Sequence, residues 1–367
     1  MTVPLVDLKA QYENIKDEVN KAIQDVLESQ IFILGPKVKE LEEKIAEYCN
    51  VKYAIGVSSG SDAILLALMS IGINSEDEVI TTPFTFFATA GSVSRLGAKP
   101  VFVDIDPKTY NINPHLIEKK ITDKTKAIIP VHLYGQCADM DPILEIAKKY
   151  NLYVIEDAAQ AIGATYKGKK AGSMGNIGCL SFFPTKNLGG YGDSGMMLTD
   201  NPEIAEKLSV LRVHGSKPKY YHSVIGCNSR LDAIQASILL AKFNHLDEWN
   251  EARRNNAGNY DSLFKDLNLI TPFSESFNYH IYHQYVIKLN QGRDQLRKSL
   301  QDAGIGTEIY YPVPLHLQKC YSDLKYKQGD LPASEEASEN TVALPIYPEL
   351  TKEQQDQVAE VIRDFLN

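Results

Sequence analysis

The sequence predicts an α/β fold in which helices cover both faces of a mainly parallel sheet. Short apolar runs of strand length alternate with segments of helical periodicity from about residue 53 to residue 200. Such alternation is typical of parallel sheets built from strand–helix–strand units. Turns of small or polar residues follow several runs, and in these sheets ligands gather at the carboxyl ends of the strands. The sequence therefore predicts where a functional site lies as well as the fold class.

The chain length favours two domains. With 367 residues, the protein is too long for one small domain. We expect a large domain over residues 1–247 and a smaller α+β domain over residues 248–367, with the charged helical segment 248–260 as the bridge. No internal repeat or low-complexity tract is visible.

Composition excludes several classes of function. The net charge is −9 and no basic block stands out, which argues against a nucleic-acid surface. No apolar run is long enough to cross a membrane, and the N-terminal residues do not resemble a signal peptide. The five cysteines are far apart and form no Cys-x-x-Cys pair, so we expect reduced thiols, no metal site and a cytoplasmic protein.

The elements follow from periodicity and turn residues. Apolar residues recur with helical spacing over residues 8–30 and again over 38–48, after the Gly35-Pro36 break. Further strands are expected at 53–57, 78–82, 100–105, 127–131, 152–155 and 196–199, and further helices at 63–68, 141–150, 202–212 and 233–246. In the second domain, strands are expected at 282–288 and 305–310, and helices at 294–303 and 351–366.

Two turns after predicted strands are candidate ligand sites. Ser59, Gly60 and Ser61 lie between a strand and a helix start, where backbone N–H groups and the helix dipole attract a phosphate. The alternative is that Ser61 or Asp62 only caps the helix. The second turn carries three phenylalanines, one of which could lie over a flat cofactor, although we expect at least two of them to be core residues: Phe84, Phe86 and Phe87.

A lysine and an aspartate at two strand ends carry the chemistry. Lys186 lies between the apolar Phe182-Phe183 and a glycine-rich turn, and Asp157 ends another apolar strand. Pyridoxal 5′-phosphate (PLP) needs an amine for its aldehyde and an acid partner for its ring nitrogen. A desolvated lysine is a good nucleophile, and a carboxylate keeps the ring nitrogen protonated. The alternatives are a solvated surface lysine and an aspartate that caps a helix.

Neighbouring residues leave similar choices open. Gln160 either contacts the ring oxygen or completes a capping box. Ser181 either adds a hydroxyl to a phosphate site or is a small strand residue. The glycine-rich stretch 172–178 does not follow a strand and open a helix, so it does not predict a dinucleotide site.

These stretches together resemble the PLP-dependent sugar aminotransferases of the DegT/DnrJ/EryC1/StrS family. The resemblance covers nearly the whole chain, and the matching stretches lie in the family's order. They are Ser58-Ser-Gly-Ser-Asp-Ala63, Pro83-Phe-Thr-Phe-Phe-Ala-Thr89, His132-Leu-Tyr-Gly135, Glu156-Asp-Ala-Ala-Gln160, Ser181-Phe-Phe-Pro-Thr-Lys-Asn-Leu188 and Asn228-Ser-Arg-Leu-Asp232.

The resemblance implies a type I aminotransferase fold and a homodimer with active sites at the interface. By position, Lys186 is the Schiff-base lysine, Asp157 pairs with the pyridinium nitrogen, Gln160 contacts the ring hydroxyl and Phe86 lies against the ring face. The phosphate is implied to bind the Gly60 and Ser61 backbone, the Ser181 hydroxyl and Asn228 of the partner subunit.

The implied reaction is a transamination in two halves. L-Glutamate gives its amino group to the cofactor and leaves as 2-oxoglutarate, and a nucleotide-linked keto-sugar then takes the amine. Lys186 shuttles the proton. Residues 136–142 and 228–232 resemble members that aminate C3 of a keto-deoxysugar linked to dTDP or UDP.

Substrate contacts and two other functions complete the expectations. Arg230 and Lys217 are candidates for the sugar nucleotide's phosphates. Tyr310, Tyr311 and His316 are candidates for the sugar, with loop packing as the favoured alternative. A PLP-dependent dehydratase of this family would carry histidine at position 186, and a non-catalytic regulator would lack Lys186 or Asp157. Both residues are present, which favours the aminotransferase.

Overall fold

A central seven-stranded sheet organises the chain. The computed structural model describes residues 2–366. The strand order is β1-β9-β8-β5-β4-β2-β3, and β9 is antiparallel to both of its neighbours while the other pairs are parallel. The strands are β1 (Tyr53–Val57), β2 (Glu78–Thr81), β3 (Lys99–Phe102), β4 (Thr125–Ile128), β5 (Tyr153–Asp157), β8 (Ile177–Ser181) and β9 (Gly195–Thr199).

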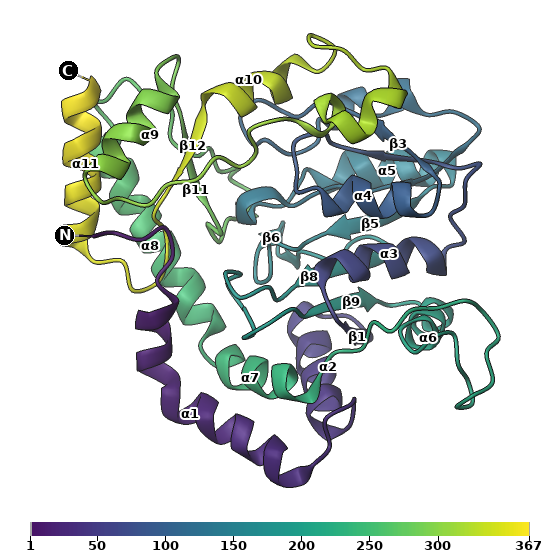
Figure 1. Cartoon of the computed structure of the whole chain (residues 1–367). Coiled ribbons are helices and arrows are strands. Elements are labelled where there is room, and N and C mark those ends of the chain that lie inside the picture. Colours follow the sequence, from purple (N-terminus) through teal and green to yellow (C-terminus); the bar gives the residue numbers. More distant parts are fainter. Residues whose placement is uncertain (1, 367) are drawn as a thin grey trace.

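Helices cover both faces of this sheet (Figure 1). One face packs against α2 (Pro36–Cys49), α5 (Met140–Tyr150) and α7 (Ala233–Phe243), and the other against α3 (Gly60–Ser70), α4 (Ala88–Arg95) and α6 (Pro202–Leu211). Neighbouring residues along a strand divide between the two faces, as Val154 and Ile155 do in β5. The predicted α/β class with a mostly parallel sheet is confirmed.

Two long helices and a smaller C-terminal part complete the fold. The helices are α1 (Leu8–Ser29) and α8 (Leu246–Phe264). The C-terminal part contains α9 (Arg293–Asp302), α10 (Pro332–Asn340), α11 (Lys352–Leu366) and the antiparallel pair β11 (Tyr285–Lys288) and β12 (Thr341–Leu344). The short strands β6 (Thr165–Tyr166), β7 (Lys169–Lys170) and β10 (Asn278–Tyr279) form a second small sheet.

The C-terminal part has its own apolar cluster. Tyr260 and Phe264 from α8 pack there with residues of α9, β11, β12 and α11. Val3 joins the same cluster, because the N-terminal segment pairs with Ile305. The boundary at residues 247 and 248 stays a prediction.

One predicted strand is absent as a regular element. The segment 305–310 is paired only at single residues, Ile305 with Val3 and Glu308 with Ala343. It therefore contacts two different partners and has no continuous ladder. Helix α10 and strand β12 were not predicted from the sequence.

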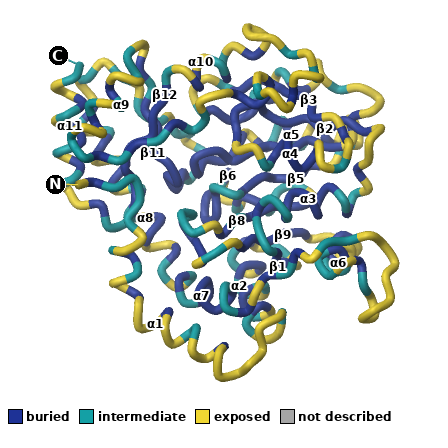
Figure 2. The backbone as a smooth tube through the Cα atoms, viewed as in Figure 1, coloured by how far each residue is buried: buried dark blue, intermediate teal, exposed yellow. Residues whose placement is uncertain are grey.

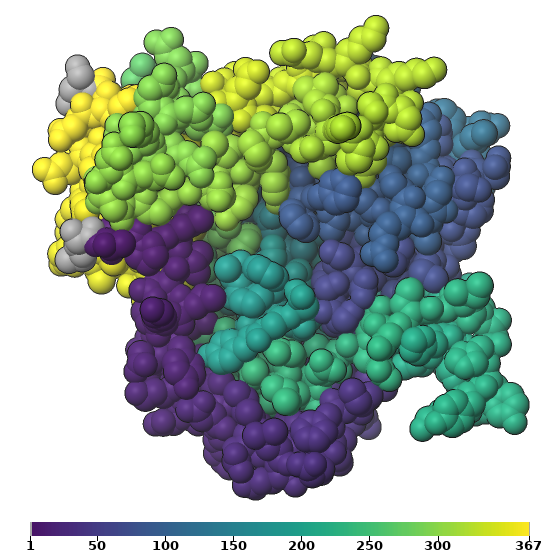
Figure 3. Space-filling model, viewed as in Figure 1, coloured from purple at the N-terminus to yellow at the C-terminus, as the bar shows by residue number. Residues whose placement is uncertain are grey.

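An exposed loop projects from the body after α6 (Figure 3). It spans residues 213–228, and its apolar side chains face outward, with Tyr220 78% and Ile225 90% exposed. Figure 2 shows the contrast with the buried strands of the sheet. Within the described residues, no helix is both long and apolar enough to span a membrane.

Candidate active site

Lys186 lies in the loop that joins β8 to β9. The loop leaves and returns at one point, because Ser181 pairs with Gly195. Two backbone bonds shape the turn, from the Lys186 N–H to the Phe183 carbonyl and from the Gly190 N–H to the Phe182 carbonyl, each 2.8 Å long. Phe182 is buried, which anchors the loop in the core. The lysine is thereby presented at the end of a sheet strand.

The surroundings favour a reactive amine at Lys186. Burial lowers the pKa of Lys186 to about 8, because the ammonium form loses hydration, and the charge of Asp157 partly opposes this shift. The alternative of a solvated surface lysine does not fit, since the Lys186 side chain is only partly exposed. A lysine with a lowered pKa has a larger neutral fraction at neutral pH, and the neutral form is the nucleophile.

Asp157 is a buried carboxylate at the end of β5. Its Oδ2 accepts a hydrogen bond of 2.7 Å from the Thr89 hydroxyl, and its Oδ1 accepts one of 3.2 Å from the Ala159 N–H. Burial raises the pKa of Asp157, while these two bonds and the charge of Lys186 act against that rise. No helix begins at Ala158, so the helix-cap alternative for Asp157 and the capping-box alternative for Gln160 are wrong.

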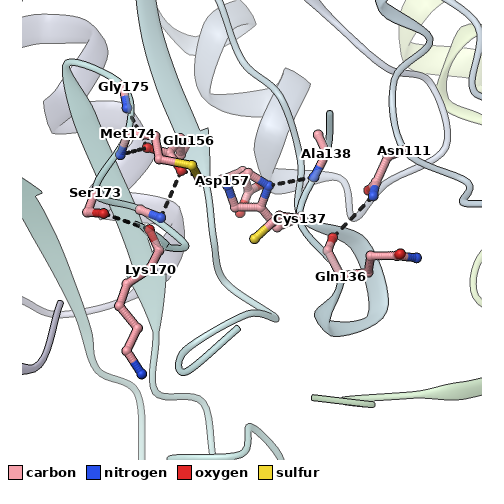
Figure 4. Close-up of polar contacts among 12 residues, drawn as sticks. Asn111, Gln136, Cys137, Ala138, Glu156, Asp157, Lys170, Ser173, Met174 and Gly175 are labelled. Atoms are coloured by element: carbon pink, nitrogen blue, oxygen red, sulfur yellow. Dashed lines mark hydrogen bonds and ion pairs between the residues drawn. The ribbon is translucent and has the colours of Figure 1, made fainter. Parts of the chain in front are cut away.

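Glu156, the residue before Asp157, is held by a network that the sequence analysis missed (Figure 4). Its two carboxylate oxygens accept hydrogen bonds from the N–H groups of Gly172, Met174 and Gly175, at 2.8, 2.6 and 2.6 Å. His132 completes the set with Nε2 at 2.7 Å. The glycine-rich stretch 172–178 thus serves to bind this carboxylate, and the network fixes the end of β5.

His132 connects that network to the strand end of Asp157. The Ala138 N–H donates to Nδ1 of His132 at 3.1 Å, so Nδ1 is the acceptor and Nε2 carries the proton that Glu156 accepts. The His132 backbone N–H in turn donates to the Asp157 carbonyl at 3.0 Å. The buried carboxylate of Glu156 and the buried imidazole of His132 therefore fix the backbone at Asp157.

A cradle of small residues lies at the start of α3, close to Ser181 at the end of β8. Ser59 caps α3 by accepting from the Asp62 N–H at 3.1 Å, so neither Ser61 nor Asp62 is the cap. Among the described residues, the N–H groups of Gly60 and Ser61 have no hydrogen-bond acceptor. A Cβ on Gly60 would lie 2.6 Å from the Ser181 Cβ, so glycine lets the Ser181 hydroxyl come close to these donors.

The segment that contains Asn228 and Arg230 borders this cradle within the same chain. The Ser58 N–H donates to the Ser229 carbonyl at 3.1 Å, and the Ser229 hydroxyl donates to Asp62 at 2.9 Å. Asn228 itself is exposed. The two stretches, more than 150 positions apart, therefore meet at the start of α3.

Gln160 and Tyr311 lie together at the site. Gln160 accepts from the Tyr134 N–H at 2.7 Å and donates to the Tyr311 hydroxyl at 3.1 Å. The ring of Phe86 lies 6.4 Å from that of Tyr311. Burial raises the pKa of Tyr311, so its hydroxyl stays protonated.

The expectation that at least two of the three phenylalanines are core residues is wrong. Phe84 is buried, but Phe86 is 58% and Phe87 46% exposed. Both line an open hollow of about 460 Å³ together with Ser61, Arg95 and Tyr321. The exposed rings of Phe86 and Phe87 therefore border this hollow.

Three predicted substrate residues have polar partners elsewhere in the chain. Lys217, in the exposed loop, forms an ion pair with Glu206 of α6. His316 is buried with Nε2 3.0 Å from Glu335, which favours the loop-packing alternative. The Tyr310 carbonyl accepts a hydrogen bond from the Tyr134 hydroxyl.

Comparison with known proteins identifies the family. The model of the DegT/DnrJ/EryC1/StrS aminotransferase family matches residues 13–363. The chain belongs to this family. It is 55% identical to a pleiotropic regulatory protein of Geobacillus stearothermophilus, with 100% of this chain and 99% of that protein covered.

Two similar enzymes carry sugar-nucleotide names. One is a UDP-2-acetamido-2-deoxy-3-oxo-D-glucuronate aminotransferase of Pseudomonas aeruginosa, 45% identical over 95% of this chain and 96% of that enzyme. The other is a UDP-N-acetyl-3-dehydro-α-D-glucosamine 3-aminotransferase of Acidithiobacillus ferrooxidans, 46% identical over 100% of this chain and 98% of that enzyme.

A solved structure supports the same family. The crystal structure of DesV of S. venezuelae in complex with a ketimine intermediate has a TM-score of 0.97 and 41% identity, with coverage of 100% of this chain and 99% of that chain. The fold is therefore the type I aminotransferase fold predicted from the sequence, and the chain is a PLP-dependent aminotransferase.

The residues present fit this cofactor. The site offers an amine of lowered pKa at Lys186, a buried carboxylate at Asp157, and free N–H donors at Gly60 and Ser61. The closeness of Gly60 to Ser181 leaves the cradle open only because residue 60 has no Cβ. These groups match an aldehyde, a ring nitrogen and a phosphate in chemical type.

Proposed function

We propose that this family member transfers the amino group of L-glutamate to C3 of a nucleotide-linked 3-keto sugar, giving an amino-sugar nucleotide and 2-oxoglutarate. The observation that carries this proposal is the position of Lys186 near the buried Asp157, close enough for their charges to act on each other, after two neighbouring strands of the sheet. Relatives at 45% and 46% identity, both named for a 3-oxo or 3-dehydro sugar nucleotide, support the position on the sugar.

Each group of residues at the site has a role in this proposal. Lys186 is the amine that holds the cofactor covalently, and Asp157 pairs with the ring nitrogen. Gln160 contacts the ring hydroxyl and Phe86 covers one face of the ring. The phosphate is held by a separate set of donors: the N–H groups of Gly60 and Ser61, and the Ser181 hydroxyl.

Bound PLP supplies an electron-withdrawing ring that carries the amino group between the two halves of the reaction. The protein moves the proton. With a pKa of about 8, the Lys186 amine is neutral in about a tenth of molecules at pH 7. Once released, Lys186 Nζ would carry the proton between the substrate carbon and the cofactor's C4′ carbon, which lies on the other side of the shared nitrogen. The Thr89 and Ala159 donors favour the ionised form of Asp157, which would hold a proton on the ring nitrogen.

The substrate's charged part needs cations near the cradle. Arg230 has no ion-pair partner among the described residues, and its segment borders the start of α3. We assign it to the substrate's phosphates, with Lys217 as a second cation on the exposed loop. We assign Tyr311 to the sugar because it is hydrogen-bonded to Gln160, and Tyr310 and His316 are the weaker candidates.

The proposal includes a homodimer in which Asn228 serves the partner's site. Its support is the exposed position of Asn228 at the base of the projecting apolar loop. Mixing Lys186→Ala and Asn228→Ala proteins after dissociation tests it. Mixed dimers contain one intact site, so random mixing restores activity to about a quarter of the wild-type value. No recovery in verified mixed dimers would exclude a shared site.

The free cysteines support a reducing, cytoplasmic setting.

A regulatory role is the competing function, because the relative at 55% identity bears a regulatory name. The retained Lys186 and Asp157 argue for catalysis. A dehydratase on the same scaffold is disfavoured by the same lysine.

Absorbance spectroscopy of the purified protein separates these functions. The visible band of the bound cofactor should bleach with L-glutamate, return with 2-oxoglutarate, and be absent in Lys186→Ala. A band that glutamate never bleaches would contradict the aminotransferase. If it bleaches, mass spectrometry of products from 3-keto and 4-keto sugar nucleotides then decides the carbon. Amination only of the 4-keto compound would overturn the C3 assignment.

A further inference from the structure

The residue after the reactive lysine is held by side chains from the distant C-terminal third. Asn187 is buried, and its side chain donates to the Asn250 Oδ1 at 2.7 Å and to the Ile281 carbonyl at 3.4 Å. Its Oδ1 lies 3.0 Å from Nδ1 of His283. Asn250 belongs to α8, and His283 lies just before β11. The turn that carries Lys186 is therefore fixed by residues that lie outside the β8–β9 hairpin.

The contact with Asn187 determines the state of His283. An amide oxygen only accepts, so the proton of the imidazole lies on Nδ1. Burial lowers the pKa of His283 well below its usual range, and the nearby cations Lys186 and Arg253 act in the same direction. Asp157 faces Lys186, and Glu349 faces Arg253. Nδ1 therefore keeps a single role as a donor, and Nε2 has no hydrogen-bond partner among the described residues.

The backbone on the other side of His283 is also constrained. Nη1 of Arg253 lies 3.4 Å from the carbonyls of Tyr282 and His283 and 2.8 Å from that of Ile346. Arg253 is buried, so its guanidinium ties this segment to α8. A side chain with a fixed backbone and a fixed tautomer is suited to setting the position of its partner.

We propose that His283 is a positioning residue for Lys186, which it acts on through its Nδ1–H bond to Asn187. Asn187 and Lys186 are adjacent, so a shift of the Asn187 side chain displaces the peptide that carries the lysine. The proposal rests on the assignment of Lys186 in the proposed function. His283 does not exchange a proton in this scheme.

Three substitutions of His283 separate the two ring nitrogens. His283→Asn keeps an N–H donor near the Nδ1 position, His283→Gln places its amide near Nε2, and His283→Leu removes both. Each holoenzyme is compared with wild type for the pH at which the visible cofactor band changes, for the single-turnover rate with saturating L-glutamate, and for thermal unfolding.

The expected result is rescue by asparagine alone. His283→Asn should keep the wild-type pH midpoint and most of the rate, whereas His283→Gln and His283→Leu should move the midpoint and slow the turnover by up to about 100-fold. The apparent affinity for glutamate should stay within a factor of about 3. Rescue by glutamine but not asparagine would overturn the proposal in favour of direct contact through Nε2. Unchanged midpoints and rates in all three variants would also overturn it.

A double-mutant cycle keeps the test decisive if His283→Leu is unstable. The effects of Asn187→Ala and His283→Gln should be strongly non-additive, because both remove the same bond. Additive effects would contradict the proposal. Loss of the band's response to glutamate in wild type would instead refute the proposed function, so the two failures are distinguishable.

Discussion

The ammonium of Lys242 lies 2.6 Å from the carbonyl oxygen of Gly189, three residues after Lys186. Lys242 comes from α7 and is 1% exposed. The rings of Tyr191 and Trp249 lie near its Nζ, at 5.1 and 5.8 Å from their centroids. The glycine-rich turn is thus held at Gly189 by a buried cation, in addition to the contacts of Asn187.

Lys242→Met should change the pH dependence of stability. Burial lowers the pKa of Lys242 to about 8, while Glu349 opposes this, and the ordinary value is 10.5. The pKa of Lys242 is lower in the folded state than in the unfolded state. Burial of this lysine therefore lowers the free energy of unfolding fully below pH 8, and this penalty disappears as the pH rises toward 10.5. The free energy of unfolding of wild type should therefore rise by up to about 3 kcal/mol across this pH range, relative to that of the variant.

Thermal unfolding of both proteins from pH 7 to pH 10 checks this slope. Lys207→Met is the control, because Lys207 is exposed and has no ion-pair partner among the described residues. A difference between wild type and Lys242→Met that stays constant with pH would contradict the prediction.

Thr89→Val should move the acid limb of the activity profile. The Thr89 hydroxyl donates to Asp157, and loss of a donor to the ionised form raises the pKa of Asp157 further. Asp157 then loses its charge at higher pH, so the acid limb of kcat/KM shifts upward by about one pH unit. Thr81→Val removes a buried hydroxyl that donates to the Ile129 carbonyl, and it should leave the limb in place. A downward shift in Thr89→Val would be inconsistent with this account.

Glu156→Gln should destabilise the fold strongly. Four donors converge on the two carboxylate oxygens, and an amide NH2 group would replace one acceptor. At least one buried donor then loses its partner, at a cost of about 3 kcal/mol. A drop in melting temperature of several degrees measures this effect. Glu76→Gln, at an exposed position, is the matched control, and equal melting temperatures for the two variants would contradict the role of the network.

Gly60→Ala should weaken cofactor retention more than stability. The new Cβ would lie 2.6 Å from the Ser181 Cβ and 3.1 Å from its Oγ, so the cradle must widen. We expect a loss of PLP affinity of about tenfold or more, measured by equilibrium dialysis. Gly258→Ala is the control, since a Cβ there meets no atom within 4 Å. Retention equal to that of the control would show that the cradle is not a phosphate site.

Local sequence pattern was sufficient to predict most of the helices and strands. The strand at 53–57 and the helix over 8–30 agree with β1 and α1, because apolar periodicity and turn residues mark their ends. Lys186 and Asp157 stand out in the sequence because one follows an apolar strand and the other ends one, and their roles toward the cofactor stay predictions. The cofactor contacts of Gln160, Phe86, Ser181 and Asn228 stay predictions.

Long-range contacts could not be read in the same way. In the sequence, His283 and Lys242 are flanked mostly by apolar or aromatic residues. No neighbouring residue indicates that they contact the turn after Lys186. The same holds for His132, which meets Glu156 from another strand end. Phe86 and Phe87 were misjudged because aromatic residues at a strand end look like core until the cleft beside them is known. The reversed direction of β9 also depends on pairing, which periodicity does not specify.

The closed base of the β8–β9 loop has a consequence for engineering. Ser181 and Gly195 pair at the base, and a Cβ on Gly195 would lie 2.5 Å from the Ser59 carbonyl carbon, so the base is packed against the cradle. Tyr191 and Asp193, in the second half of the loop, are exposed. Residues inserted there enlarge a loop whose two ends are already pinned together. The hairpin is therefore open to change only at this exposed edge, because its base and the buried residues 187–190 beside Lys186 are packed.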